Sequence, residues 1–319
     1  MRLSSLPYLW RVQMAGRKPN FLIVGAAKTG TTSIFEYLKQ HPDIFLPTKE
    51  TFHFISEIYK GNNLPYPAQR PHEEIVFDEA AFLAAYEAAG DQTILGEIAT
   101  GYLYYPEIAI PNIKKMLGDD LYMVAVLRNP VGRTYSGYTF FSRDLHEKLS
   151  FEDALAAEKE RTEANWDFMW HYVAHSKYAD SVKAYQDAFP KLKVMFFDDL
   201  KEDPAAFMKE LYEYLGVDPE VDMDLSMKNV SGAPKSKVFQ TLITQENPIK
   251  KLFRPLLRAF FGREARHRIR QWLKARNVGD RDSITNEQYN ALLPEFEEDV
   301  KKLERLTGRD LSSWREPRS

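Results

Sequence analysis

The chain has 319 residues, of which 44% are hydrophobic, and it carries a formal net charge of −3 with no cysteine. This length and apolar content are enough to bury a large core. The slightly negative charge argues against a general nucleic-acid binder, and the lack of cysteine excludes disulfides and thiol chemistry. No run approaches the roughly eighteen apolar residues of a membrane span, and residues 1–16 do not resemble a signal peptide, so we expect a cytoplasmic protein.

Strands and helices are expected to alternate along the chain. Apolar runs predict strands at 21–24, 44–46, 93–96, 121–127 and 192–197. Helical patterns are expected at 31–40, 79–89, 131–141, 151–161, 178–189 and 205–215. The alternation predicts an α/β fold: a P-loop-like parallel sheet with helices on both faces, a helical C-terminal part, and ligands at the carboxyl ends of the strands. We expect residues 1–20 to be an N-terminal extension and 21–319 to be a single domain.

The first strand runs into a short loop bounded by Gly25 and Gly30, and a helix follows. Such a turn directs backbone N–H groups and the positive end of the helix dipole at one point, where a phosphate or sulfate can bind. The spacing of the two glycines matches the nucleoside-triphosphate loop, but Thr31 stands where that motif needs its lysine. The expected anion cradle consists of Lys28, Thr29, Gly30, Thr31 and Thr32.

A second candidate motif follows the strand at 121–127. It reads Arg-Asn-Pro-Val-Gly-Arg-Thr-Tyr-Ser-Gly-Tyr from Arg128 to Tyr138. Pro130 fits the first turn of a helix, so Arg128 is expected at the end of the strand and Ser136 about two turns into the helix. Both side chains could therefore face one phosphate of a ligand.

These two motifs resemble those of sulfotransferases that use 3′-phosphoadenosine 5′-phosphosulfate (PAPS). In that family, Lys-[ST]-Gly-Thr-[ST] after a strand binds the 5′-phosphosulfate, and R-x-P-x-x-R-x-x-S-x-Y binds the 3′-phosphate. The resemblance implies that Lys28 and its loop hold the phosphosulfate, that Arg128 and Ser136 hold the 3′-phosphate, and that Arg133 is a structural neighbour. Further similar segments extend the resemblance from Phe21 to Trp314. The relatives it indicates are bacterial-type enzymes, related in fold to the heparan sulfate sulfotransferases.

Sulfuryl transfer to an alcohol resembles phosphoryl transfer, with a loose in-line transition state that is stabilised mainly by positioning and by charge. Lys28 is the candidate cation for the leaving oxygen. No metal is expected. His171 and His175 have the spacing of a zinc motif on a helix, but Tyr172 occupies the place of the glutamate that a hydrolytic zinc site needs.

A base must also take the proton of the acceptor hydroxyl. In the heparan sulfate enzymes this base is a glutamate two residues before a histidine, and Glu50 fits its place. His53 stands one position late, and in an extended segment that shift turns a side chain to the opposite face. We predict Glu50 as the base, with His53 as the alternative. Glu50 could instead pair with Lys49, and His53 could pack in an aromatic cluster.

The sequence says less about the acceptor substrate than about the donor. The extra lysine that heparan sulfate enzymes carry in Glu-Lys-[ST]-Pro is absent, because this chain has Ile98 at that position. The predicted function is sulfuryl transfer from PAPS to a hydroxyl or amine of a carbohydrate, a lipid or a small metabolite. One alternative is a nucleoside-triphosphate-dependent P-loop kinase, which Thr31 and Arg128 oppose.

A third possibility is a nucleotide-binding peripheral membrane protein without turnover. Residues 250–276 motivate it, because they are basic and amphipathic and could contact an anionic membrane. Packing of this stretch on the core, with a solvated basic face, is the favoured interpretation. The sequence does not indicate an oligomeric state.

Overall fold

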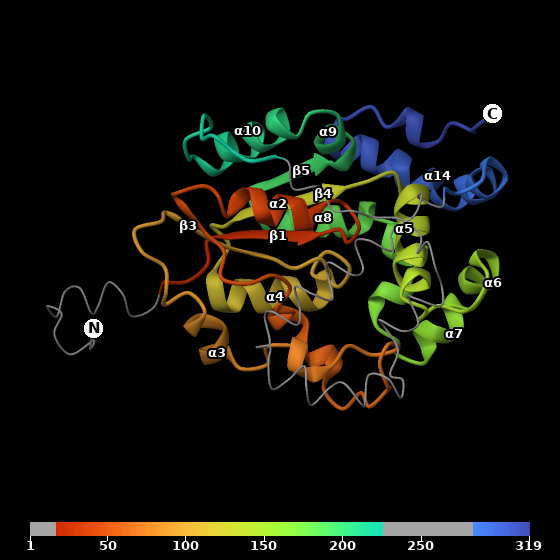
Figure 1. Ribbon diagram of the computed structural model, residues 1–319, viewed down its shortest axis with the longest axis horizontal. Helices are drawn as coiled ribbons and strands as arrows, with labels where there is room; N and C mark the ends of the chain where they lie inside the picture. Colours follow the sequence, from red (N-terminus) through yellow and green to blue (C-terminus); the bar gives the residue numbers. More distant parts are fainter. Residues whose placement is uncertain (1–16, 226–282) are drawn as a thin grey trace, which may run out of the picture.

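The computed structural model describes residues 17–225 and 283–319 (Figure 1). In this part of the chain, five parallel strands form one sheet in the order β2-β3-β1-β4-β5. The strands are β1 (Phe21–Gly25), β2 (Ile44–Phe45), β3 (Ile94–Ile98), β4 (Tyr122–Leu127) and β5 (Leu192–Phe196).

Helices connect the strands and also form the C-terminal part of the chain. The longer ones are α2 (Thr31–Leu38), α4 (Pro106–Leu117), α5 (Pro130–Arg143), α8 (Ala179–Ala188), α10 (Pro204–Leu215) and α14 (Asn286–Thr307). The shorter ones are α3 (Glu79–Ala84), α6 (Phe151–Ala156), α7 (Glu158–Glu163) and α9 (Phe197–Glu202). The tighter 3-10 helices are η2 (His53–Tyr59), which is kinked at Ile55, and the single turns η3 (His72–Glu74), η4 (Phe168–Trp170), η5 (Ala174–Ser176) and η6 (Ser312–Trp314).

The sheet is buried on both faces, as its nearly continuous apolar strands predict. Along β1, Phe21 and Ile23 join a core that includes α2, α9 and α10. The alternating residues Leu22 and Val24 join a larger core with α4, α5, α8 and α14. Figure 1 shows α9 and α10 on one side of the sheet and α4 on the other. The predicted fold class is confirmed.

Several element boundaries differ from those expected. The helix predicted at 151–161 is two helices, α6 and α7, that meet at Ala157. The helix predicted at 79–89 ends at Ala84. Just before β1, the N–H of Asn20 donates to the carbonyl of Leu95, and the carbonyl of Asn20 accepts from the N–H of Tyr122. The basic stretch 250–276 lies outside the described residues.

The topology places a binding site at the neighbouring ends of β1 and β4. The helix that follows β1, α2, packs on one face of the sheet, and the helix that follows β4, α5, packs on the other. A crevice therefore opens between the two connections, at the carboxyl ends of the strands, which is where ligands bind in open α/β sheets.

Candidate functional site

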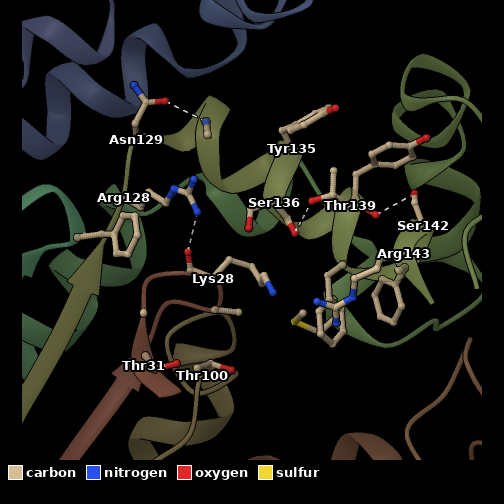
Figure 2. Close-up of a pocket in the computed structure, with 18 of the residues that line it drawn as sticks. Lys28, Thr31, Thr100, Arg128, Asn129, Tyr135, Ser136, Thr139, Ser142 and Arg143 are labelled. Atoms are coloured by element: carbon tan, nitrogen blue, oxygen red, sulfur yellow. Dashed lines mark hydrogen bonds between the residues drawn. The ribbon is translucent and has the colours of Figure 1, made fainter. Parts of the chain in front are cut away.

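A cavity of about 2280 Å³ opens at the carboxyl ends of β1 and β4 (Figure 2). It brings together two motifs that are about a hundred residues apart in the sequence. The sequence-predicted residues in its lining are Lys28, Gly30, Thr31, Thr32, Glu50, Arg128 and Ser136. Two other predicted site residues, Thr29 and His53, are not among the lining residues.

The loop after β1 is shaped by its glycines. Gly30 has φ 80 and precedes the first turn of α2, and no side chain caps this helix start. A Cβ at Gly30 would lie 2.7 Å from a methyl carbon of Leu200. Thr29 is fully buried, and its Oγ1 donates to the carbonyl of Ala26 at 2.7 Å, so its hydroxyl closes the loop rather than facing the cavity. The N–H groups at the start of α2 are therefore available to bind an anion.

Two arginines connect this loop to the motif after β4. Arg128 donates from Nη1 to the carbonyl of Lys28 at 3.1 Å, and its guanidinium lies 4.8 Å from the ring centroid of Phe197. Arg133 is fully buried and donates to the carbonyl of Ala27 at 3.3 Å. Arg133 thus holds the loop in place from behind, whereas Arg128 lines the cavity.

The helix α5 contributes many residues to the cavity lining, and four of them form a stripe along the helix. Gly132, Ser136, Phe140 and Arg143 follow one another at intervals of three or four residues, which places them on one helix face. Ser136 was predicted from the sequence, whereas Arg143 was not. The signal was available, because seven residues are close to two helical turns and bring Arg143 onto the face of Ser136.

Lys28 lines the cavity and is affected by several neighbouring cations. Its Nζ is 4.1 Å from the ring centroid of Phe140. The pKa of Lys28 is lowered to about 7, first by burial and then by the nearby charges of Arg143, Arg133 and Arg128, against an opposite effect of Glu50. An anion bound here would favour the protonated amine.

The segment that carries the candidate bases is not extended, so the expected change of face does not apply. Glu50 has φ 61, Phe52 has φ 52, and the tight helical turn η2 begins at His53. The Glu50 side chain is 30% exposed; its Oε1 accepts from Thr100 Oγ1 at 3.2 Å and lies 3.4 Å from Nζ of Lys49. Glu50 therefore reaches the cavity, as a base must. It also pairs with Lys49, which was the structural alternative to a catalytic role.

His53 occupies a different environment. Its Nδ1 lies 2.9 Å from the carbonyl oxygen of Val76, and its ring stacks on Phe82 with centroids 4.6 Å apart. Burial lowers the pKa of His53. The histidine is thus packed in an aromatic cluster, which is the structural alternative that the sequence left open.

Glu97 supports the turn that presents Glu50, and the sequence analysis had not assigned it a role. It is fully buried at the end of β3, where it accepts from the N–H of Thr51 at 2.9 Å and from the hydroxyl of Tyr102 at 3.0 Å. Burial raises the pKa of Glu97 to about 7. The N–H of Glu50 also bonds to the carbonyl of Ile98 at 2.8 Å. The base candidate is therefore positioned by the sheet.

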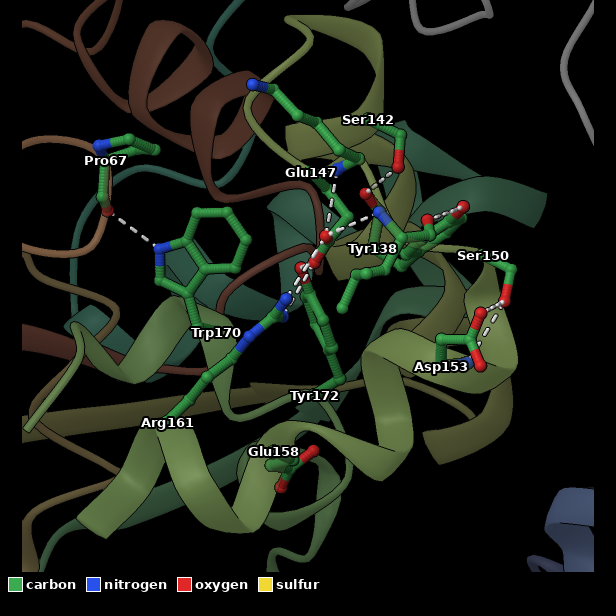
Figure 3. A network of polar contacts seen from close by, with 12 residues as sticks. Pro67, Tyr138, Ser142, Glu147, Ser150, Asp153, Glu158, Arg161, Trp170 and Tyr172 are labelled. Atoms are coloured by element: carbon green, nitrogen blue, oxygen red, sulfur yellow. Dashed lines mark hydrogen bonds and ion pairs between the residues drawn. The ribbon is translucent and has the colours of Figure 1, made fainter. Parts of the chain in front are cut away.

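A buried ion pair fixes the far wall of the cavity (Figure 3). Glu147 accepts from Arg161 Nη1 at 2.7 Å and from the hydroxyl of Tyr172 at 3.0 Å, and the two side chains of the ion pair are 2% and 8% exposed. Glu147 also accepts from the N–H groups of Lys148 and Leu149. The loop after α5 is therefore held by a carboxylate whose main partner is one arginine.

We expect Arg161→Met to destabilise the protein by about 3–5 kcal/mol, because it leaves the Glu147 carboxylate buried without its cation. Tyr172→Phe removes one hydrogen bond to the same carboxylate and is the matched control, with an expected cost of about 1.5–3 kcal/mol. Urea unfolding measures both. A loss in Arg161→Met no larger than in Tyr172→Phe would show that the ion pair does not stabilise the loop.

No metal cluster or membrane span is found among residues 17–225 and 283–319. These ranges contain no group of three or more His, Asp or Glu side chains placed to hold a metal ion, and no helix long and apolar enough to cross a bilayer. The two histidines with zinc-motif spacing do not share an α-helix, since His171 precedes the turn η5 and His175 lies within it. Burial lowers the pKa of His171 to about 4.

Comparisons with known proteins decide the family. Residues 109–254 match a family described as "Sulfotransferase domain". A solved sulfotransferase from Alicyclobacillus acidocaldarius is 30% identical to this chain, with a TM-score of 0.69, and the match covers 94% of this chain and 100% of that one. The chain belongs to the sulfotransferase family. The predicted family, a sulfotransferase related to the heparan sulfate enzymes, is confirmed.

Two curated relatives of this sulfotransferase support the same assignment. "Bifunctional heparan sulfate N-deacetylase/N-sulfotransferase 3" from Homo sapiens is 26% identical over 212 residues, which are 64% of this chain and 23% of the relative. "Heparan sulfate glucosamine 3-O-sulfotransferase 3B1" from Mus musculus is 25% identical over 209 residues, which are 64% of this chain and 48% of the relative. The chain therefore spans about half or less of the length of these relatives.

Proposed function

We propose that this sulfotransferase moves a sulfuryl group from PAPS to a hydroxyl or amine of a carbohydrate, a lipid or a small metabolite. The observation that carries the proposal is the meeting of two anion-binding elements with a carboxylate in one cavity. Lys28 and the start of α2 form one element, Arg128 and Ser136 form the other, and Glu50 lines the same space. We further propose one cytoplasmic domain, 21–319, that acts without metal or nucleic acid.

The donor fits across the ends of β1 and β4. The 5′-phosphosulfate would lie against the loop from Lys28 to Thr32, where N–H groups, hydroxyls and one ammonium can meet its oxygens. The 3′-phosphate would lie between Arg128 at the end of β4 and Ser136 on α5. These two side chains come from adjoining parts of one motif, so a single phosphate can contact both.

The reaction requires one bond exchange and one proton transfer. The bond from sulfur to the bridging oxygen breaks, and its electron pair stays on the phosphate of the product 3′-phosphoadenosine 5′-phosphate (PAP). Lys28 stabilises the charge that develops on this oxygen. The acceptor oxygen forms the new bond to sulfur, and Glu50 takes its proton.

The acceptor would enter from the side of Glu50 and the loop after α5. In the described part of the chain, the large hydrophobic side chains that stand out as exposed are Tyr66 at 57% and Leu149 at 41%, and both line this cavity. One charged lining residue on this side, Arg70, is paired with Asp167 at 3.2 Å. A mixed wall of this kind supports an acceptor that presents an apolar part beside its hydroxyl. The names of the curated relatives add saccharides to the candidates.

Two measurements test the proposal. Calorimetry should show binding of PAP without magnesium and much weaker binding of ATP with magnesium, because the cavity offers arginine and serine for a 3′-phosphate. Radiolabelled PAPS should then transfer sulfate to a compound in a screen of sugars, lipids and phenols. Preference for ATP with magnesium would favour the kinase alternative, and PAP binding without transfer to any class of acceptor would favour the nucleotide-binding protein without turnover.

Arg128→Ala and Ser136→Ala are expected to act mainly on donor binding. The arginine variant should lose more affinity than the serine variant, because charge-assisted hydrogen bonds are roughly twice as strong as neutral ones. Each loss should shrink when the ligand is adenosine 5′-phosphosulfate, which lacks the 3′-phosphate. Equal losses for ligands with and without that phosphate would show that the two residues do not recognise it.

A further inference from the structure

The cavity-lining stripe of α5 continues beyond Ser136 to a second cation. Phe140 lies four residues after Ser136, and Arg143 lies seven residues after it. All three line the cavity, and the Arg143 side chain is 26% exposed. The helix that is proposed to hold the 3′-phosphate through Ser136 therefore places a guanidinium two turns further along the same face.

Arg143 and Lys28 lie against the same aromatic ring. The ring centroid of Phe140 is 4.1 Å from Nζ of Lys28 and 5.6 Å from the guanidinium carbon of Arg143. Figure 2 shows both head groups directed toward the same part of the cavity. Consistent with this proximity, Arg143 is the charge that lowers the pKa of Lys28 most after burial itself. The face of the Phe140 ring attracts both cations, which offsets part of their mutual repulsion.

Two acidic groups act on these cations, one on each of them. Arg143 pairs with the neighbouring Asp144, whose Oδ1 lies 3.6 Å from Arg143 Nε. Glu50 acts on Lys28 as the weakest of the named charges. Two like charges held near each other in a partly desolvated cavity repel, and an anion between them removes that cost. The end of β3 supplies no cation, because residues 97–100 are Glu, Ile, Ala and Thr.

We propose that Arg143 is a second cation for the transferred sulfuryl group, acting beside Lys28. This inference rests on the proposed function. While the bond from sulfur to the bridging oxygen breaks, Lys28 acts on that oxygen and Arg143 donates N–H groups to the equatorial oxygens of the sulfuryl group. The acceptor attacks in line, its proton goes to Glu50, and Arg143 neither gains nor loses a proton. Preorganised donors of this kind favour the transition state.

A purely structural role for Arg143 makes a different prediction. Arg143 ends α5, and a cation in the last turn of a helix interacts favourably with the helix dipole. If this were its whole role, its loss would loosen α5 and weaken all ligands that α5 contacts. PAP separates the two roles, because it has the 3′-phosphate that α5 is proposed to hold and lacks the sulfuryl group.

The test compares the affinities of PAPS and PAP for the wild type, Arg143→Gln and Arg143→Lys by calorimetry. We expect Arg143→Gln to bind PAPS about tenfold more weakly and PAP within about twofold of wild type, with Arg143→Lys between wild type and Arg143→Gln. Once an acceptor is found, kcat of Arg143→Gln should fall by about a hundredfold. Lys148→Gln is the control, since it removes an exposed cation from the same cavity lining outside the stripe.

The outcomes separate this inference from the proposed function. A wild type that binds neither PAPS nor PAP would overturn the proposed function and with it the role of Arg143. A wild type that binds both, with Arg143→Gln weakening both equally or neither, would overturn the role of Arg143 alone. A loss of PAPS affinity of the same size in Lys148→Gln would also overturn it, because general electrostatic attraction would then explain the effect.

Discussion

Replacing Lys28 with alanine should lower turnover by about a hundred- to a thousandfold, while PAP affinity falls much less. The substitution removes the one ammonium of the loop after β1, and a preorganised donor at a developing oxyanion is worth roughly 3–4 kcal/mol. Product binding keeps the N–H groups at the start of α2, along with Arg128 and Ser136. Single-turnover transfer of labelled sulfate measures the first effect, and calorimetry with PAP measures the second.

Lys39→Ala is the control for Lys28→Ala, because Lys39 lies at the opposite end of α2 and is exposed. It should leave turnover and affinity unchanged. Turnover near the wild-type rate in Lys28→Ala would overturn the role assigned to Lys28. A fall in PAP affinity as large as the fall in turnover would show that the lysine serves binding rather than the transfer step.

The lowered pKa of Lys28 predicts a proton uptake on donor binding. Burial and the neighbouring arginines lower this pKa to about 7. A bound bisphosphate raises it, so above about pH 7 binding of PAP must bring a proton to Lys28, and affinity must fall as pH rises through that range. Calorimetry in buffers of different ionisation enthalpy measures the uptake. Lys28→Arg should abolish it, since arginine stays protonated, and an uptake unchanged in that variant would assign it to another group.

The parts of the site that could be predicted lie where local sequence determines local structure. The loop from Gly25 to Gly30 and the motif from Arg128 to Ser136 each combine a buried strand, a turn and a helix start, and each retains its expected geometry. Parallel strands meet at one edge of a sheet, so their convergence also followed from the alternation of elements. The fold class could be predicted for the same reason.

The parts that could not be predicted depend on tertiary contacts. The segment from Glu50 to Phe54 has two residues with positive φ, which the buried Glu97 helps to hold through Thr51, and nothing in its local pattern indicates this turn. Thr29 belongs to the expected motif, yet its hydroxyl turns inward to Ala26. The helix α14 is different, because its capping box at Thr285 and Gln288 is a local signal that the sequence analysis did not use.

Glu50→Gln should lower turnover by about a hundredfold or more and leave donor affinity nearly unchanged. Glutamine keeps the shape of the side chain and can still accept from Thr100, but it cannot take the proton of the acceptor. Measurement of kcat with a saturating acceptor, together with PAPS affinity, separates chemistry from binding. If kcat is retained in Glu50→Gln, Glu50 is the exposed partner of Lys49 and another group is the base.

His53→Ala decides between the two candidate bases. We expect it to cost far less turnover than Glu50→Gln, because His53 stacks on Phe82 and does not line the cavity. Its larger effect should be on stability, measured by urea unfolding, since the substitution leaves space in an aromatic cluster. The reverse ordering of turnover would mean that η2 rearranges on acceptor binding and brings His53 to the reacting oxygen. Equal large losses, with a double variant no worse than either single one, would mean that Glu50 and His53 act as a unit on the acceptor proton.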